Sequence, residues 1–263
     1  MRGEIRMRCL AWIACGLCLA GAAARAWALD EVVLANGEWA PYQSAKLPHQ
    51  GFASHVVSEA FRLAGIQVVY RFYPWARAEA MVRGGGVAGS LVWSETPQRR
   101  AFAWFSDPVI VDDEVVFHLA TRKMKAERIE DFYGLTMATF NGSRLGAWQE
   151  AIDAGRIRSY VVKDIEAGMR QLLIGRLDFI PLIRSVGFSV LRQHFTPREQ
   201  AAILAEPHVF VRAEYGVMFS RKQPGGEALL RRFNAGLAKL KASAEYRQMA
   251  RDFAAGKYDP QPY

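Results

Sequence analysis

Cysteine is scarce in this sequence and occurs only near the N-terminus, at Cys9, Cys15 and Cys18. These residues belong to a run of 16 uncharged residues that follows a basic start. Small residues at Ala26 and Ala28 complete the pattern of a secretory signal peptide, and the run is shorter than the roughly 20 apolar residues of a membrane span. We therefore expect residues 1–28 to be removed and the mature chain to be periplasmic. The alternative is an uncleaved anchor.

The chain that remains after residue 28 contains no thiol. Disulfide bonds, a cysteine nucleophile and a thiolate metal site are therefore excluded. Blocks of like charge are absent too. Of the formal net charge of +8, residues 1–28 carry +3 (four arginines and one glutamate), and about +5 is spread over the rest. An exported chain with this even charge distribution is not expected to bind nucleic acid.

Motifs for metal binding and for nucleophilic catalysis are also missing. The five histidines are scattered, without a pair four residues apart and without a His-Glu-x-x-His motif. Neither a Gly-x-Ser-x-Gly turn nor a phosphate-binding glycine loop is present. We therefore expect no metal, no cofactor and no enzymatic activity.

What the sequence does contain is a regular alternation of strand and helix patterns, and this alternation occurs twice. Strand and helix patterns alternate over 31–37, 51–65, 66–73, 75–85 and 87–93. The same order returns over 135–140, 143–155, 159–163, 166–175 and 177–183. Alternating strands and helices predict parallel pairing with right-handed crossovers, so each half is expected to form its own α/β unit.

Two similar α/β units in one chain predict two lobes. Strand-like segments near 115–123 and 208–220 would join them, and the long amphipathic segment 225–256 is expected to pack back on the first lobe. We predict an α/β fold of two lobes, each a mostly parallel sheet flanked by helices, joined by two hinge strands. The predicted boundaries are 29–118 for the first lobe, 119–213 for the second lobe and 214–263 for the return to the first.

A basic pair in the first half suggests an anion site. Thr96 and Pro97 have the pattern of a helix N-cap followed by proline at the first helical position, which places Arg99 in the first turn. An arginine there can bind a carboxylate through two parallel hydrogen bonds. The alternative is a surface arginine, or one stacked on Trp93 or Trp104.

Several segments in register resemble one known family. They are "ANGEWAPYQ" after the first strand, "WSETPQRRAFAWFSDPV" around the basic pair, "DFYGLTMATFNGS" and "LLIGRLDFI". Together they resemble the family 3 extracellular solute-binding proteins of the polar amino-acid type, which have the type II periplasmic binding fold. The resemblance implies capture of a small carboxylate-bearing solute, an amino acid or related organic acid, between two closing lobes. It further implies delivery to an ABC importer permease in the inner membrane, by a monomer without enzymatic activity.

The resemblance also implies a set of ligand-binding residues. Arg99 falls where the family's arginine clamps the ligand carboxylate, with Ser94 beside it. Ser143 falls where a serine of the second lobe reaches the same carboxylate. Trp39 and Tyr42 fall in a loop that supplies an aromatic wall.

The chain departs from the family's pattern where the ligand ammonium is held. The family usually has an acidic residue five positions after the aspartate of Gly-Arg-x-Asp, and here that position is Ile183. Asn36 stands where an aspartate is common, and Trp75 is a further candidate wall. Because a buried ammonium needs a partner, we expect that Glu38 or a backbone carbonyl substitutes, or that the ligand has no ammonium.

Two other functions stay open at this point. The first is an enzyme on the same fold, similar to periplasmic cyclohexadienyl dehydratases, in which a cleft carboxylate such as Glu38 or Glu95 would act as general acid. The second is a sensory binding module that reports to a membrane receptor or kinase.

Overall fold

The first α/β unit forms as the periodicity predicts. The computed structural model describes residues 30–140 and 145–260. The unit consists of β1 (Asp30–Asn36), α2 (Phe52–Leu63), β2 (Ile66–Phe72), α3 (Trp75–Gly84) and β3 (Gly89–Trp93). Strand β1 lies in the middle and pairs in parallel with both β2 and β3. The predicted parallel crossovers are therefore confirmed for this half.

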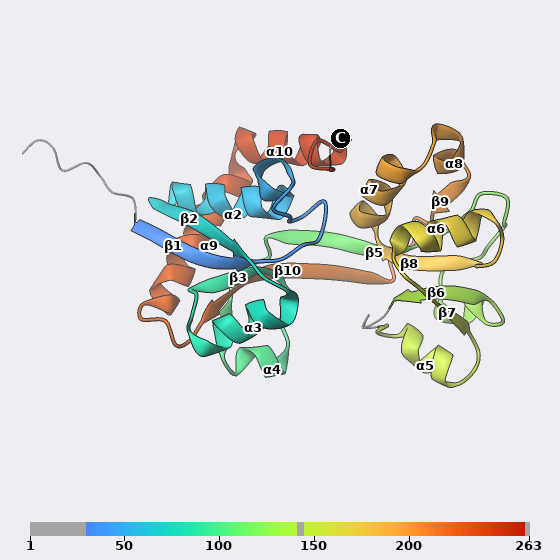
Figure 1. Cartoon of the computed structure of the whole chain (residues 1–263), viewed down its shortest axis with the longest axis horizontal. Coiled ribbons are helices and arrows are strands. Elements are labelled where there is room, and N and C mark those ends of the chain that lie inside the picture. Colours follow the sequence, from blue (N-terminus) through green and yellow to red (C-terminus); the bar gives the residue numbers. More distant parts are fainter. Residues whose placement is uncertain (1–29, 141–144, 261–263) are drawn as a thin grey trace, which may run out of the picture.

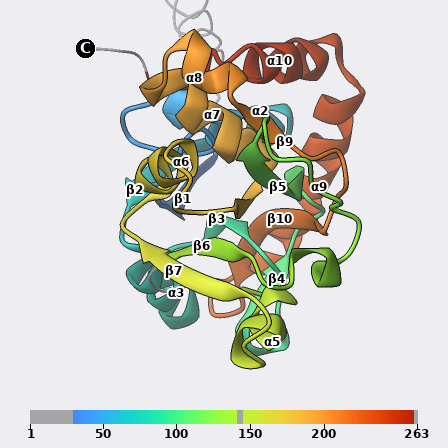
Figure 2. The ribbon, with the colours of Figure 1, turned by 90° about the vertical axis from the view of Figure 1, so that its right-hand side faces the viewer.

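The second unit repeats this topology. It consists of β6 (Thr136–Phe140), α5 (Trp148–Asp153), β7 (Arg158–Val162), α6 (Ile165–Leu173) and β8 (Phe179–Ile183). Strand β6 pairs in parallel with both β7 and β8. Viewed from the end of this unit, α5 lies on one side of the strands and α6 lies on the other (Figure 2).

Two long antiparallel strands connect the units. They are β5 (Ile110–Leu119) and β10 (Val211–Ser220), and they run between two lobes that lie side by side along the long axis of the molecule (Figure 1). The main path of strands is β2-β1-β3-β10-β5-β8-β6-β7. The lobe boundaries predicted after residues 118 and 213 stay predictions, and both fall inside these connecting strands.

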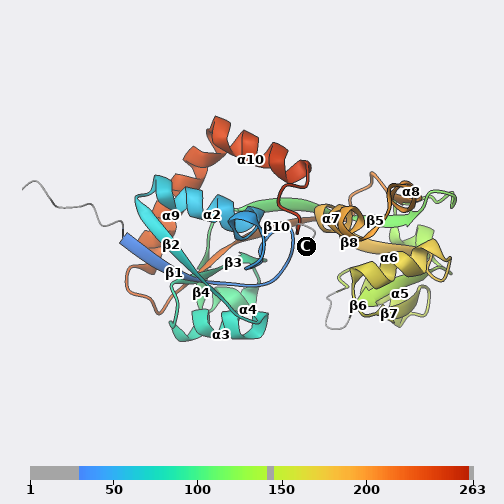
Figure 3. The same ribbon diagram turned by 45° about the horizontal axis from the view of Figure 1, so that its top comes forward.

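The chain returns to the first lobe through its last two helices, α9 (Gly226–Ala242) and α10 (Ala244–Ala254), which lie beside α2 (Figure 3). The sequence pattern is one amphipathic segment, but the backbone is extended at Ser243, whose hydroxyl accepts a hydrogen bond from the N–H of Tyr246. Ser243 thus ends one helix and caps the next. No helix within 30–140 or 145–260 has the length and apolar character needed to cross a membrane.

One helix without a counterpart in the sequence prediction, α7 (Arg184–His194), begins directly after β8. Its Val186 belongs to the first-lobe core, whereas its Leu191 belongs to the second-lobe core. Helix α7 therefore touches both lobes. The remaining short elements are η1 (Pro48–Gln50), α4 (Pro97–Arg100), β4 (Ala103–Phe105), η2 (Ile129–Phe132), α8 (Pro197–Ala201) and β9 (Ile203–Ala205).

Candidate functional site

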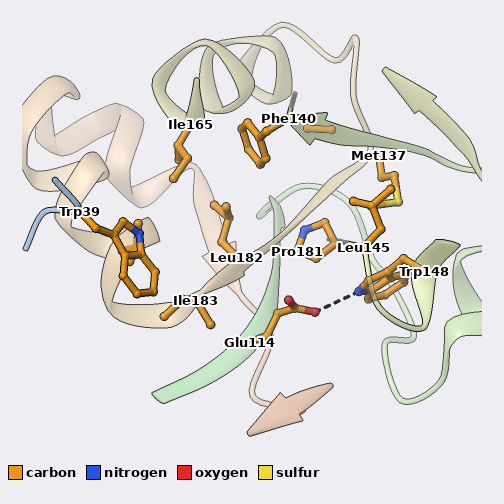
Figure 4. Close-up of a pocket in the computed structure, with 12 residues that line it drawn as sticks. Trp39, Glu114, Met137, Phe140, Leu145, Trp148, Ile165, Pro181, Leu182 and Ile183 are labelled. Carbon is orange, nitrogen blue, oxygen red and sulfur yellow. Dashed lines mark hydrogen bonds between the residues drawn. The ribbon is translucent and has the colours of Figure 1, made fainter. Parts of the chain in front are cut away.

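A cavity of about 350 Å³ lies where the two lobes meet. The first lobe contributes Trp39, the connecting strand β5 contributes Glu114, and the second lobe contributes Trp148 at the start of α5. Figure 4 shows Trp39 and Trp148 on opposite sides, with Glu114 between them. The other lining residues are aliphatic or aromatic, and they include Phe140, Ile165, Leu182 and Ile183. The volume lies within the range of small-molecule sites.

An adjoining cavity of about 520 Å³ shares four residues with the first, namely Glu114, Leu145, Trp148 and Ile183. Its lining is more polar and comes largely from β10 and from residues 145–148, with Ser94 and Glu95 added from the loop after β3. The residues of this second cavity that carry charge or a hydroxyl group are Ser94, Glu95, Glu114, Arg212, Glu214 and Tyr215. We refer to the two cavities together as the cleft.

Among the described residues, Glu114 is the one charged residue common to both cavities. The pairing of three strands fixes its position, because Glu114 of β5 lies opposite Val211 of β10 and Ile183 of β8. The Trp148 Nε1–H donates a hydrogen bond of 3.0 Å to its Oε1. Burial raises the pKa of Glu114 above its ordinary value, and the Trp148 hydrogen bond opposes this change.

Sequence reasoning missed Glu114 as a site residue. It lies in "VDDEVVFHL", where the acidic residues of β5 immediately precede the buried part of that strand. A charged residue at the edge of such a strand was the available signal. The strand that brings Ile183 beside it begins more than 60 positions later, so sequence alone could not place the carboxylate in a cleft.

The aromatic wall on the first-lobe side is held by other aromatic rings. The ring of Trp39 lies 5.0 Å from that of Tyr42 and 5.2 Å from that of Tyr215, centroid to centroid. Trp39 lines the cavity, whereas Tyr42 is fully buried behind it. The predicted pair is therefore close together in space, but only Trp39 lines the cleft.

Tyr42 is bonded to the connecting strand. Its hydroxyl donates a hydrogen bond to Asp112 Oδ2, and the same oxygen accepts the backbone N–H of Ser185, 3.2 Å away at the start of α7. Burial, followed by the charge of Asp112, raises the pKa of Tyr42 far above its ordinary value. Tyr42 thus ties the loop before α2 to both β5 and α7.

Asn36 has its hydrogen-bonding groups engaged within the protein. It is fully buried, its Nδ2 donates to Ser54 Oγ at 2.9 Å, and its Oδ1 accepts the Gly37 N–H at 2.9 Å. Asn36 lines neither cavity of the cleft. Its observed contacts are those of a residue that fixes the turn after β1.

Glu38 and Trp75 lie together, but away from the cleft cavities. They line a separate cavity of about 310 Å³ with residues of the β2–α3 loop. Glu38 Oε1 accepts the backbone N–H of Ala45 at 3.1 Å. The Trp75 ring packs edge-on against Trp93, with the centroids 5.3 Å apart.

The predicted helix start at the basic pair is confirmed. Helix α4 begins at Pro97, and Thr96 Oγ1 accepts the backbone N–H of Arg99 at 3.2 Å. Arg99 and Arg100 bind different acidic partners. The exposed guanidinium of Arg100 pairs with Glu95 at 2.5 Å.

Arg99 is held by its own lobe. Its Nε and Nη2 each lie 3.3 Å from Glu79 Oε2, its Nη1 donates to the Ser94 carbonyl oxygen at 3.0 Å, and its guanidinium carbon lies 4.5 Å from the centre of the Trp93 ring. Ser94 lines the larger cavity, whereas Arg99 lines neither. Arg99 therefore contacts the cleft residue Ser94 and pairs with Glu79. The carboxylate clamp stays a prediction.

Of the predicted site residues, the structure brings Trp39 and Ser94 to the cleft. Ser143 lies outside the described residues. Over 30–140 and 145–260, no group of three or more His, Cys, Asp or Glu side chains is arranged to hold a metal ion.

The chain matches the bacterial extracellular solute-binding proteins, family 3, over residues 32–255. It belongs to this family. The mixed α/β fold with two repeated units is the type II periplasmic binding fold of its relatives. No curated protein sequence gave a significant match.

Solved structures with this fold include binding domains and a sensor. Substrate-binding domain 2 of Lactococcus lactis GlnP, in an open conformation, has 17% identity and a TM-score of 0.65, with 89% of this chain and 97% of that one covered. The Nostoc punctiforme GluR0 ligand-binding core in complex with L-glutamate has 17% identity and a TM-score of 0.64, and the match covers 84% of this chain and 98% of that one. A histidine kinase sensor domain with similarity to periplasmic binding proteins has 18% identity and a TM-score of 0.63, and the match covers 86% of this chain and 96% of that one. At these identities the likeness shows the fold.

Proposed function

We propose that this chain is an exported, non-enzymatic binding protein that captures a small solute in the cleft and delivers it to an ABC importer. The observation that carries the proposal is a cavity whose walls come from both lobes and from a connecting strand: Trp39, Trp148 and Glu114. A solute that touches both lobes binds the closed arrangement more tightly than the open one, and it therefore shifts the population toward closure.

Export and delivery extend the proposal beyond the family assignment. The basic start, apolar run and small residues of 1–28 support a cleavable signal and a periplasmic location. Partners of this kind of protein are a small-molecule ligand and an importer permease in the inner membrane, and we propose that the protein works as a monomer. The family description, an extracellular solute-binding protein, supports this location.

The carboxylate clamp is the second part of the proposal. Arg99 would hold a ligand carboxylate with Ser94 from the first lobe and Ser143 from the second. Arg99 could exchange Glu79 for the ligand, because both Glu79 contacts are long, at 3.3 Å, and converge on a single carboxylate oxygen.

A sensory role is a second candidate, and the similarity to a histidine kinase sensor domain favours it. In that role the same closure would report solute concentration to a membrane receptor. Expression of the full chain with and without a candidate importer permease distinguishes the two, because only delivery requires the permease for uptake of the solute.

The experiment that tests capture is a thermal-shift screen of residues 29–263 against amino acids, amines and organic acids. A ligand at 100 times its Kd should add about 2.7 kcal/mol to the free energy of unfolding. Failure of every compound to raise Tm would contradict capture of these solutes. Steady turnover of a cyclohexadienyl acid would instead show that the protein is an enzyme.

A further inference from the structure

Acidic side chains predominate among the described charged residues that line the larger cavity. The sequence has a formal net charge of +8, yet the larger cavity is lined by three glutamates, Glu95, Glu114 and Glu214, and by one arginine, Arg212. Arg212 lies 3.6 Å from Asp113, and Glu95 pairs with Arg100, so Glu114 and Glu214 are the lining carboxylates without an ion pair in the described chain. A concave site lined by one sign of charge concentrates ligands of the other sign. These carboxylates therefore favour a cationic group in their part of the cleft.

Glu114 differs from the other two glutamates in its surroundings. Glu95 and Glu214 are exposed, whereas Glu114 is partly buried in the wall shared by both cavities. In the described chain no Lys, Arg or His lies within ion-pair distance of its carboxylate, and Trp148 supplies the one hydrogen bond to it from a side chain. An ionised carboxylate accepts about four hydrogen bonds, so this group has acceptor capacity left. A desolvated charge without a partner is unfavourable, and a bound cation would offset that cost.

The groups around Glu114 suit an organic cation. Trp39 and Tyr215 form one aromatic wall, and Trp148 lies on the opposite side. Aromatic faces attract ammonium groups, and tryptophan does so most strongly. A metal ion is a poorer fit, because calcium and magnesium require several oxygen ligands, and the described residues contain no such cluster.

We infer that Glu114, Trp39 and Trp148 form a recognition site for an organic ammonium group carried on an apolar body. The inference rests on the proposed function and names the ligand chemistry of the same cleft. The ammonium pairs with Glu114, and the body fills the space along Phe140, Ile165 and Leu182. The acidic group that Ile183 fails to supply at the end of β8 is thereby provided by the residue opposite it on β5.

The test compares compounds that share one apolar body but differ in charge. The probes are L-phenylalanine and 2-phenylethylammonium, which carry an ammonium, and 3-phenylpropanoate and 3-phenylpropanamide, which do not. Binding is measured by titration calorimetry on residues 29–263 as wild type, Glu114→Gln and the control Glu150→Gln. Glu150 is an exposed residue of α5 that lines neither cavity, so its variant makes the same chemical change outside the site.

We expect Glu114→Gln to weaken the ammonium compounds by at least about tenfold, since a charge-assisted contact is lost. The neutral 3-phenylpropanamide should bind the variant as well as it binds the wild type, and the anionic 3-phenylpropanoate should bind the variant at least as well, because the negative charge that repels it is removed. The control should change no affinity. Phenyltrimethylammonium, whose charge is fixed, should lose affinity for the wild type as pH falls and Glu114 takes up a proton, and should show no such loss with Glu114→Gln.

Three results would overturn the inference. They are equal weakening of ammonium and non-ammonium compounds in Glu114→Gln, unchanged affinity of the ammonium compounds in that variant, and no binding of any probe. The other charged or titratable groups near Glu114, namely Glu95, Asp113, Arg212, Glu214 and Tyr215, are the same in every variant, so they cannot produce a difference between the variants. If the probes fail while the solute screen finds another ligand, the ligand chemistry is wrong but the proposed function stands. If the screen also fails, both are wrong.

Discussion

At the scale of single residues, Glu114 shows how a binding group can cost stability. Its carboxylate is partly removed from water, and the group that offsets this cost in the described chain is the indole N–H of Trp148. A residue in this position is favourable only when a ligand compensates for the lost hydration. The charge of Glu114 therefore lowers the stability of the unliganded protein but favours ligand binding.

The first prediction concerns the stability of the unliganded protein. Glu114→Gln should raise the free energy of unfolding by about 1 kcal/mol at neutral pH, because the amide carries no charge and its oxygen can keep the Trp148 hydrogen bond. Urea unfolding of wild type and variant measures the difference. A less stable variant with an unchanged denaturant slope would contradict the prediction.

The pH dependence of that difference has a definite sign. Burial raises the pKa of Glu114 in the folded protein above its ordinary value of 4.5, so the folded state keeps the proton where the unfolded chain has lost it. The stability of the wild type relative to the variant should then be highest below pH 4.5 and fall as pH rises through the raised pKa. Above that pKa the difference should be constant.

The second prediction concerns the two neighbouring arginines. Arg99→Ala should lower the free energy of unfolding by about 2 kcal/mol, because Arg99 contacts Glu79, the Ser94 carbonyl and the Trp93 ring. Under the clamp proposal it should also abolish the rise in Tm caused by a carboxylate ligand. Arg100→Ala should change neither property, since its pairing with Glu95 is exposed. Equal loss of binding in both variants would contradict the clamp.

At the scale of elements, the contact between α2 and α9 depends on the absence of a side chain. A Cβ added at Gly236 would lie 2.0 Å from the carbonyl oxygen of Ala60. That oxygen belongs to the backbone of a packed helix, so it cannot move aside without moving α2. The two helices can approach this closely only because residue 236 is glycine.

The third prediction follows from this contact. Gly236→Ala should lower the free energy of unfolding by about 3 kcal/mol, because overpacking forces the two helices apart. Gly84→Ala is the matched control, since nothing lies within 4 Å of its added Cβ and its backbone is helical. The control should be neutral or more stable by about 1 kcal/mol. Thermal unfolding of both variants measures the contrast, and similar Tm values would disprove the close approach.

Elements with a strong local pattern were predictable from sequence, and elements set by distant contacts were not. The Thr96–Pro97 helix start and the parallel strands of both units follow from local spacing, and the structure has them. The Arg99–Glu79 pairing joins two helices across 20 positions, and spacing could not reveal it. Asn36 and Tyr42 were predicted at the ligand, but no local pattern shows that Ser54 and Asp112 bind their polar groups.

At the scale of the whole molecule, β5 and β10 are the connections that would bend if the lobes close on a ligand as proposed. They are the strands that pass between the lobes, while α7 contacts both cores beside them. A ligand bound between Trp39 and Trp148 would draw the walls of the cleft together by bending these connections.

The fourth prediction measures this closure. Residues 29–263 contain no cysteine, so cysteines introduced at the exposed Gln98 of α4 and Gln149 of α5 can be spin-labelled selectively. The distance between the labels should shorten and its distribution should narrow when a saturating ligand is added, because the ligand favours the closed population. Labels placed at Gln98 and Lys239, both within the first lobe, should show no change. An unchanged distance across the cleft would argue against closure.

The strand order also determines when each part of the sheet can form as the chain is synthesised. Strand β10 lies between β3 and β5 in the sheet, yet it is made after every strand of the second lobe. An emerging chain can therefore pair β6, β7 and β8 while the first lobe still lacks a central strand, and pairings between distant segments form slowly. The cleft needs the last of these pairings, because Glu114 is fixed opposite Val211. Ligand binding in the cleft thus requires β10 to be paired with β5, and the part of the chain that precedes β10 cannot form this site by itself.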